Sequence, residues 1–538
     1  MENESALASP IVETPKVAYK SSGSGVKFAE ARRRLPINVF SNTFWLFLHT
    51  ITSMWYTPYL IKRLGVAAYG LVPLANSVTA YLSVLTAGFD SAIGRFLTID
   101  LARNDTKAAN RTFNTAFMGS VAVLEILSPV VFLISWLAPQ IFNMPLGYER
   151  DAQWLVFLSA LAFMLTTFSS SFAVSSYAYY RFDLRLVVNV IRLTAQMASI
   201  VLLFLAFSPQ LWHVGMGIFL SSLILFVGYW LLWRKLTPQL EVRPKWFDLS
   251  LLKKMLTFGG WILVNQLGAM LFLNIDLIIA NRVFGPEVAG RYGSVLVLPS
   301  SLRALVSTID GVLVPIVLTL YAQKNRSRLV LFSRFSVKLM GLIVALPIGL
   351  LCGLSKPFLT LWLGAEFADL SWLLFVLISH LCVSLAVVPL FSLQVATGNV
   401  KIPGLVSLLS GCGSALLAFV LARWSGLGYI GIAVAGAIML ILKNGLFTPL
   451  YGAHILALPR FTFLPSLFGG ALGTLFVAAG GYLCSVRCAP MSWGGLALAA
   501  LFLSLVYLVA VFFVGLSAED RALLKDELER RLRQYVNE

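Results

Sequence analysis

The chain has 538 residues, of which 58% are hydrophobic and only 12% are charged. This balance excludes an ordinary soluble globular domain, whose charged fraction is about twice as high, and indicates a polytopic membrane protein. The net charge of +17 does not indicate nucleic-acid binding, because the basic residues are spread over many short loops. The sequence has no GxxxxGK[ST], HExxH or GxSxG motif, so ATP-driven transport and soluble-domain catalysis are not expected.

Apolar windows of the length that crosses a bilayer recur along almost the whole chain. A hydrocarbon core of about 30 Å requires about 20 apolar residues in a helix. The sequence lacks the alternating pattern of a membrane β-barrel, so an all-α fold is expected. The fourteen predicted spans lie near residues 37–61, 70–95, 112–138, 153–178, 186–207, 213–233, 255–280, 290–318, 332–354, 370–394, 402–422, 428–450, 462–484 and 492–516.

Lys and Arg residues are distributed unequally between alternate loops. The side that holds both termini carries 28 of them, the opposite side carries 8 and the spans carry 5. Because cytoplasmic loops are enriched in Lys and Arg, we expect both termini in the cytoplasm. The four histidines are dispersed and the five cysteines lack ligand spacing, so neither a metal site nor a cofactor is predicted.

A basic, proline-containing linker divides the spans into two halves. The predicted segments are a disordered cytoplasmic tail (1–36), a first six-helix lobe (37–233), the linker (234–254), a second six-helix lobe (255–450), two additional spans (451–516) and an amphipathic cytoplasmic helix (517–538).

The first span carries polar side chains at steps of three and four residues, which place them on one helical face. Such a stripe should face protein or water, because lipid offers it no hydrogen-bond partner. The second span has a similar polar stripe, which includes Asn76 and Asp90. Arg95 lies off that stripe, and Glu125 lies in the third span. The first-span residues on the stripe include Asn42, Trp45, His49 and Tyr56.

The eighth span places a cation and a carboxylate on one helical face. Arg303, Ser307 and Asp310 fall within one arc of roughly 80°. Asp276 lies near the outer end of the seventh span, and Lys443 lies in the twelfth. Ionisable groups inside a membrane are costly, so they are candidates for function.

Each of these groups also has a structural interpretation. Arg303 contacts either an anionic group in a central cavity or a carboxylate that fixes the packing of the spans. Asp90, Asp310 and Glu125 either bind a coupling ion or pair with a nearby arginine. Asp276 is the more structural of the carboxylates, with packing or gating as its expected role.

The stretches 39–105 and 259–325 share one layout. At an offset of 220 residues, Asp90 aligns with Asp310 and Gly65 with Gly285. The link RLGVAAYG in the first copy resembles VFGPEVAGRYG in the second, which is three residues longer, so aligning the links requires a gap. Duplication over this length is typical of a transporter built from two related halves. Arg303 has only a serine as its counterpart, so the second copy is predicted to have specialised in holding an anion.

Several motifs resemble one transporter family. They are LGVAAYG after the first span, GFDSAIGRF in the second, FGGWILVNQLG and NIDLIIANRVFG in the repeat, and ATGNVKIPG after the tenth span. They resemble the polysaccharide transporter, or O-antigen flippase, family of the multidrug/oligosaccharidyl-lipid/polysaccharide exporter superfamily. The resemblance covers about residues 37–516. It implies two six-helix lobes around a central cavity, often with two further spans.

The resemblance also implies a function. Such proteins move undecaprenyl-diphosphate-linked oligosaccharides from the inner to the outer leaflet of the bacterial inner membrane, driven by an ion gradient. The implied partners are the lipid-linked oligosaccharide, the phospholipid bilayer, and a polysaccharide polymerase with its export machinery. The substrate-binding candidates are Arg303, Arg95, Asn42, Trp45, His49, Tyr56, Asn76, Ser307 and Lys443. The candidates for coupling to H⁺ or Na⁺ are Asp90, Asp310, Glu125 and Asp276.

Three other functions remain open at the level of the sequence. A multidrug or lipid-precursor exporter of the same superfamily would have a cavity dominated by carboxylates. A membrane glycosyltransferase or polymerase would need a sizeable outer loop with paired carboxylates or arginines, whereas the outer loops are short. A structural partner in an envelope assembly would lack a continuous polar cavity.

Overall fold

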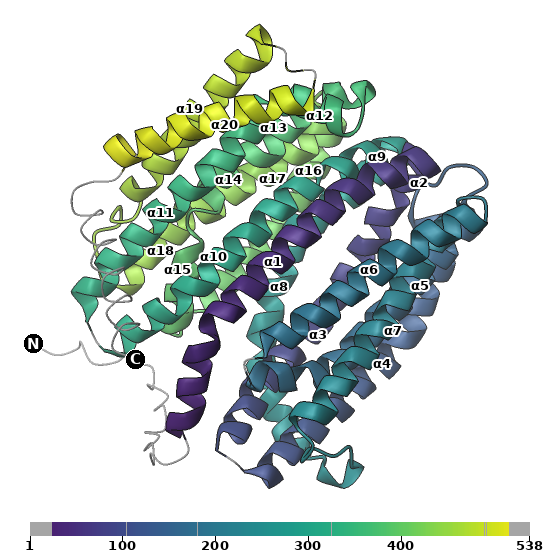
Figure 1. Cartoon of the computed structure of the whole chain (residues 1–538), viewed down its shortest axis with the longest axis vertical. Helices are drawn as coiled ribbons and strands as arrows, with labels where there is room; N and C mark the ends of the chain where they lie inside the picture. The colour runs from purple at the N-terminus through teal and green to yellow at the C-terminus, as the bar shows by residue number, and fades with distance from the viewer. Residues whose placement is uncertain are drawn as a thin grey trace, which may run out of the picture.

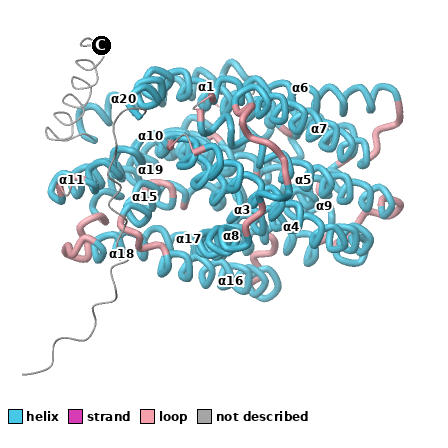
Figure 2. The backbone as a smooth tube through the Cα atoms, turned by 90° about the horizontal axis from the view of Figure 1, so that it is seen from below, coloured by secondary structure: helices cyan, strands magenta, loops and turns pink. Residues whose placement is uncertain are grey.

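In a computed structural model, the chain folds into long, roughly aligned helices (Figure 1). The structure describes residues 24–103, 105–179, 181–323, 325–488, 490 and 492–515. Every regular element in these ranges is helical, and no strand occurs in them (Figure 2). The predicted all-α membrane fold is therefore confirmed.

The count of fourteen spans is not confirmed. Among the described residues, thirteen helical segments are long and apolar enough to cross a membrane. The predicted span 37–61 is not among them, although it lies within a long helix that begins at Ser24. Residues 24–36, predicted as part of a disordered tail, are thus helical in the structure. The predicted C-terminal helix 517–538 lies outside the described residues, as do residues 1–23.

We call the helices before the linker the first bundle. α5 packs against α3, α4 and α7, while α6 packs against α1 and α7. The bounds of these helices are α1 Ser24–Leu64, α2 Val66–Tyr69, α3 Leu71–Ala102, α4 Thr106–Ile141, α5 Glu149–Ala178, α6 Phe182–Ala206 and α7 Leu211–Leu236.

We call the helices from α8 to α18 the second bundle, against which the last two helices pack. α16 packs on α8 and α17, and α19 packs along α11. The bounds are α8 Leu249–Phe284, α9 Pro286–Val295, α10 Val297–Ala322, α11 Arg326–Gly353, α12 Ser355–Trp362, α13 Ser371–Ser379, α14 Leu381–Ser384, α15 Val388–Ala396, α16 Lys401–Trp424, α17 Ile430–Leu440, the π-helical η3 Ile441–Phe447, α18 Thr448–Ile455, α19 Pro465–Arg487 and α20 Trp493–Ala510. Short elements η1 (Pro244–Trp246), η2 (Ala365–Leu370) and η4 (Val511–Gly515) complete the list.

The two copies of the repeat have the same backbone geometry at equivalent positions. Gly65 and Gly285 end their helices with positive φ angles of 84° and 90°, which glycine adopts without strain. At the other end of the repeat, the side chain of Asp105 accepts a hydrogen bond from the first turn of α4. Asn325 caps α11 in the same way.

The links within the two copies align without a gap. Because one offset of 220 residues holds at both ends of the repeat, Gly70 is equivalent to Gly290 rather than to the glycine of the second Tyr-Gly pair. The structure brings these two glycines together, since a Cβ on Gly70 would lie 2.7 Å from the backbone nitrogen of Gly290. Equivalent residues meet in this way near a pseudo-twofold axis. The gap predicted from the sequence is therefore wrong.

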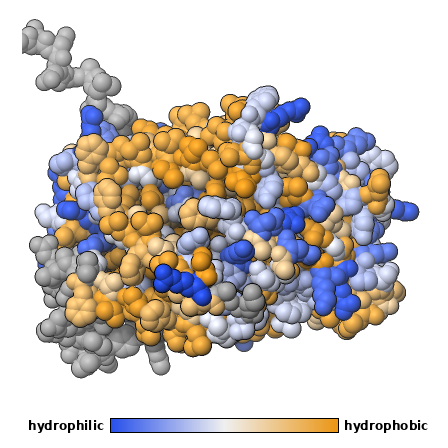
Figure 3. Space-filling view, turned by 90° about the horizontal axis from the view of Figure 1, so that it is seen from above, coloured by the Kyte–Doolittle hydropathy of each residue, from blue (hydrophilic) through white to orange (hydrophobic). Residues whose placement is uncertain are grey.

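The outer surface of the helices is strongly apolar, as a membrane protein requires. Large exposed apolar side chains occur along α19 and α20, including Leu472, Leu475, Leu501 and Phe502. Figure 3 shows apolar side chains over much of one view, interrupted by hydrophilic patches. The chain is thus a multi-pass membrane protein with an apolar surface for lipid.

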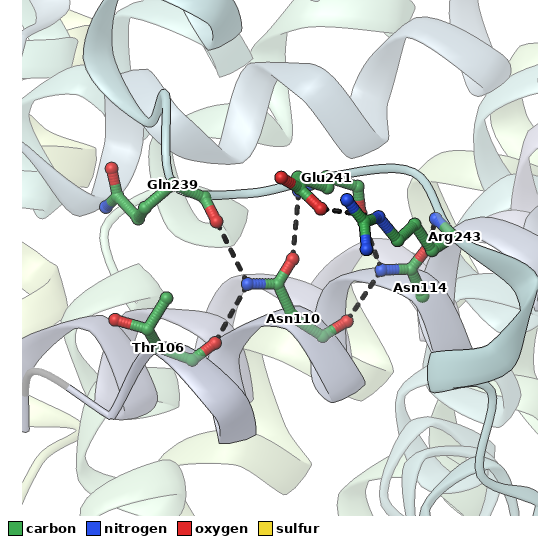
Figure 4. A network of polar contacts seen from close by, with 6 residues as sticks. All are labelled: Thr106, Asn110, Asn114, Gln239, Glu241 and Arg243. Carbon is green, nitrogen blue, oxygen red and sulfur yellow. Dashed lines mark hydrogen bonds and ion pairs between the residues drawn. The ribbon is translucent and has the colours of Figure 1, made fainter.

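The connection between α7 and α8 is fixed to α4 by two asparagines (Figure 4). Asn110 donates to the carbonyl of Gln239 at 3.0 Å and accepts from the N–H of Glu241 at 2.9 Å. One turn later, Asn114 donates to the carbonyl of Glu241 at 2.8 Å and accepts from the N–H of Arg243 at 2.7 Å. We call residues 237–248 the strap, because they lie along the start of α4.

The strap ends at Asp248, where α8 begins. Its backbone N–H donates to Thr115 Oγ1 at 3.0 Å, and its carboxylate caps α8. A hydrogen bond from the hydroxyl of Ser250, then the backbone N–H of Leu251 and the nearby Arg111, hold the pKa of the Asp248 carboxyl below its usual value. The start of α8 is therefore attached to the first bundle.

Buried apolar side chains form one shared core at one end of the molecule and two separate cores toward the other. The shared core contains residues of both bundles, such as Leu64, Tyr69, Leu277 and Tyr292. Farther along, one core lies mainly within the first bundle and another within the second, although Met255 of α8 belongs to the former. The bundles thus converge at the end that holds α2 and α9, the α2/α9 end (Figure 1). They separate toward the end that holds the strap, the basic end.

Candidate functional site in the second bundle

A small cavity inside the second bundle is lined by ionisable side chains from three parts of the chain. Asp276 comes from α8, Arg303 from α10 and His380 from the break between α13 and α14. The cavity has a volume of about 20 Å³. That volume holds roughly one water molecule, since one water requires about 10–15 Å³ on the same measure.

Asp276 has one carboxylate oxygen bonded and one free. The side chain is only 6% exposed. Its Oδ2 accepts a hydrogen bond of 3.1 Å from the hydroxyl of Tyr292, while Oδ1 is buried with no protein partner among the described residues. A buried carboxylate oxygen without a partner is costly, so it requires a proton, a water molecule or an ion.

His380 presents a similar unpaired atom. The chain is not continuously helical here, because α13 ends at Ser379 and α14 begins at Leu381. The ring Nδ1 lies 3.1 Å from the carbonyl of Val376. A carbonyl only accepts, so Nδ1 carries a proton in this contact. Nε2 is left buried with no partner among the described residues.

Arg303 lines the same cavity without a direct partner. No hydrogen bond or ion pair within 4 Å joins its guanidinium to any residue that the structure describes. The carboxylate of Asp276 and the guanidinium therefore share the cavity without touching. In this conformation the cavity is too small for a phosphate group, so an anionic ligand reaches Arg303 only after the surrounding helices move.

Lys443 lies beside this cavity in the π-helical segment η3. Its ammonium nitrogen lies 5.8 Å from the ring centre of Phe272 and 5.3 Å from that of Phe391. Phe272 also lines the cavity of Asp276 and Arg303. Contact with two aromatic faces stabilises a cation where it is partly removed from water, and π-helical turns frequently occur at functional sites.

Asp310 forms a second polar site, toward the basic end of α10. Its Oδ2 accepts a hydrogen bond of 3.4 Å from Ser392 of α15, and its Oδ1 is buried without a partner among the described residues. The side-chain nitrogen of Gln394, also in α15, is likewise buried without a partner among the described residues. Ser307, one turn before Asp310, is exposed.

The predicted residues of the first bundle do not gather into one site. On α1, Asn42 and His49 are exposed, and the rings of Trp45 and His49 lie 5.6 Å apart. Asn76 of α3 is also exposed. The hydroxyl of Tyr56 is buried without a hydrogen-bond partner among the described residues.

Of the predicted ionisable residues of the first bundle, Glu125 does not join the cluster in the second. Glu125 lies on an exposed face of α4 beside Ile126, which is 71% exposed. Asp90 and Arg95 belong to α3, but their side chains lie outside the described residues.

Sequence reasoning did not include Tyr292 or His380 among the site residues. Tyr292 was counted only as part of the link between the two spans of the repeat. The sequence signal for Tyr292 is its position sixteen residues after Asp276. With a tight turn between the two helices, this spacing brings Tyr292 back to the level of Asp276 in the bundle. His380 lies in the predicted span 370–394, and the break between α13 and α14 at this residue has no clear sequence signal.

Comparison with known proteins identifies the family. A family described as "Polysaccharide biosynthesis protein" matches residues 38–321. A relative from Bacillus subtilis (strain 168), the "Uncharacterized membrane protein EpsK", is 31% identical over 491 residues, which are 91% of this chain and 97% of that protein. The chain belongs to the polysaccharide biosynthesis protein family. This membership confirms the resemblance that the sequence motifs indicate.

Solved structures share the fold of this family member at low sequence identity. The lipid II flippase MurJ, in an inward closed conformation, matches with a TM-score of 0.64 at 11% identity, over 88% of this chain and 98% of MurJ. An inward-facing multidrug resistance MATE transporter of the MOP superfamily matches with a TM-score of 0.61 at 14% identity, over 81% of this chain and 98% of that one. The chain therefore has the helical fold of these transporters.

Proposed function

We propose that this family member is a flippase that moves an undecaprenyl-diphosphate-linked oligosaccharide across the bacterial inner membrane by ion-coupled alternating access. Membership in a polysaccharide biosynthesis family supports a glycan substrate. The fold shared with transporters supports movement of that substrate rather than its chemical conversion. On this proposal both termini are cytoplasmic, the α2/α9 end faces outward, and a polysaccharide polymerase receives the product.

The observation that carries the proposal is the set of unpaired charged groups inside the second bundle. Arg303 and Lys443 have no carboxylate within ion-pair distance among the described residues. Such cations are suited to hold a diphosphate in a cavity of low polarity, because isolated charges there are stabilised mainly by a counter-ion. Movement of the helices of the second bundle that surround Arg303 would widen the cavity to admit the diphosphate.

On this proposal, different side chains bind the sugar and the coupling ion. Polar and aromatic side chains of α1, such as the exposed Asn42 and the half-buried Trp45, would meet sugar hydroxyls. Asp276 and Asp310 each have a buried carboxylate oxygen without a protein partner, which suits an exchangeable proton or a sodium ion. Binding of the ion and of the diphosphate would be coupled through the charge of Arg303, since Asp276 shares its cavity.

The decisive experiment replaces Arg303 in a strain that depends on this protein for surface polysaccharide. Arg303→Ala should abolish surface polysaccharide while the protein remains in the membrane at its normal level, whereas Ser300→Ala on the same helix should have no effect. Unchanged polysaccharide in the arginine variant would contradict the proposal. In proteoliposomes, transport that persists after collapse of both proton and sodium gradients would refute the coupling role of Asp276 and Asp310.

A further inference from the structure

One hydrogen bond at the α2/α9 end joins the two bundles through a carbonyl of a transmembrane helix. The indole Nε1 of Trp362, at the end of α12, donates to the carbonyl oxygen of Met54 in α1 at 2.6 Å. Trp362 is only 7% exposed and belongs to the core shared by the two bundles. The bond therefore crosses the bundle interface in a place shielded from water.

The Met54 carbonyl is available because of the sequence of α1. In an α-helix the carbonyl of residue i accepts from the N–H of residue i+4. The residue four positions after Met54 is Pro58, which has no N–H. Since α1 is helical throughout Ser24–Leu64, this carbonyl has no donor within its own helix. Trp362 of the second bundle supplies the missing donor.

A second set of cross-bundle hydrogen bonds lies at the same end. The backbone N–H of Asn143, just after α4, donates to Oδ1 of Asn281 at 2.8 Å. The side-chain nitrogen of Asn143 donates to the carbonyl of Asn281 at 2.8 Å, and that of Asn281 donates back to the carbonyl of Asn143 at 2.9 Å. Each asparagine thus satisfies the backbone of the other, and Asn281 is fully buried.

We propose that Trp362 and the proline-freed carbonyl of Met54 form a latch that holds the bundles together at the α2/α9 end. The Asn143–Asn281 pair is a second contact that holds the two bundles together at this end. Separation of the bundles at this end leaves the Met54 carbonyl without a donor unless water reaches it, so the latch sets the balance between the two orientations of the transporter. Only this last consequence rests on the proposed transport function; the closure itself does not.

The test measures the separation of the bundles directly. Spin labels are attached to cysteines at Leu146 and Glu287, which are exposed at the α2/α9 end on opposite bundles. The five native cysteines are first replaced, and the full chain is placed in lipid nanodiscs. Trp362→Phe keeps an aromatic ring but removes the donor. We expect it to raise the population with separated labels by about two- to tenfold, the effect of one net hydrogen bond.

Pro58→Ala provides the matched background. An alanine at this position restores a backbone N–H within α1, so the Met54 carbonyl no longer needs Trp362. In this background Trp362→Phe should therefore cause no further separation. Trp372→Phe, at an exposed tryptophan of the second bundle, should leave the distances unchanged in both backgrounds.

Two results would overturn the latch. One is an unchanged distance distribution in Trp362→Phe; the other is an equal shift with and without Pro58, which would assign the effect to loss of ring packing. Surface polysaccharide is not part of this readout. The latch can thus fail while the transport proposal stands, and the reverse outcome is equally distinguishable.

Discussion

The two bundles share a repeated backbone, but their interiors differ in chemistry. Inside the first bundle, the buried polar groups are largely serines, threonines and asparagines, and a cluster of aromatic rings in tilted and edge-on contact includes Phe113, Phe172 and Trp233. Inside the second bundle lie two carboxylates with unpaired oxygens, a histidine and two cations. Among the described residues of the first bundle, Arg192 has its Nε buried and unpaired.

This difference in buried polar groups indicates which bundle requires a ligand. Several buried serines of the first bundle are satisfied by their own helix, as Ser169 is by the carbonyl of Leu165 at 2.6 Å. The free Oδ1 of Asp276 and the guanidinium of Arg303 have no such local acceptor or donor. Ion and anion binding therefore belong to the second bundle on our proposal, while the first bundle supplies a scaffold and the polar surface of α1.

The largest expected effect comes from removing charge at one position of the repeat. Asp276→Asn keeps the shape of the side chain and an acceptor for Tyr292, but it removes the charge. We expect surface polysaccharide to fall to background, with little change in the apparent thermal midpoint of the purified protein. The equivalent position in the first bundle, 220 residues earlier, is Tyr56.

Tyr56→Phe is the matched control for this variant. The tyrosine hydroxyl is buried without a partner among the described residues, so its removal should be neutral or slightly stabilising. Surface polysaccharide should stay at the wild-type level. If both variants lose transport equally, the functional asymmetry between the bundles is wrong.

The next effect concerns the position where the two copies of the repeat touch. A Cβ added to Gly290 would lie 2.0 Å from the carbonyl oxygen of Val66, which the backbone cannot accommodate without moving. Gly290→Ala should therefore separate the bundles at the α2/α9 end and destabilise the closed form by about 1–3 kcal/mol. Distances between spin labels on the two bundles would measure this separation.

Gly311→Ala is the control for this effect, because open space surrounds that helical glycine. Alanine there should be neutral or stabilising by about 0.5–1 kcal/mol, as in other helix interiors. Closed bundles in Gly290→Ala would mean that the contact between the glycines is not needed for closure.

The sequence predicted the helices better than it predicted the site. Apolar windows locate helices because burial in lipid depends on composition alone. The cavity of Asp276 and Arg303 depends on four helices meeting at one level, namely α8, α10, α13 and α17. The sequence left open whether Arg303 contacts an anion in a central cavity or a carboxylate, and in this structure the cavity around it has space for about one water molecule.

A smaller effect, on protease cleavage of the strap, distinguishes the two bundles at the basic end. Asn114 is fully buried and holds the strap through Glu241 and Arg243. Its equivalent in α11 is Arg334, which is exposed. Asn114→Ala removes at least two hydrogen bonds, each of about 0.5–1.5 kcal/mol. We expect trypsin to cleave after Lys245 about ten- to a hundredfold faster, whereas Arg334→Ala should leave that rate unchanged.

The smallest expected effect tests where the two copies remain alike. Asp105 Oδ1 accepts from the N–H of Ala108 at 2.9 Å, and Asn325 Oδ1 accepts from the N–H of Arg328 at 3.2 Å. Replacing either cap by alanine should cost about 1 kcal/mol. The loss of stability should be larger for Asp105 than for Asn325, because the negative charge of Asp105 also interacts with the helix dipole. Hydrogen exchange in the first turns of α4 and α11 should therefore accelerate by about two- to tenfold in the respective variants. An effect in only one helix would show that the caps, like the interiors, have diverged.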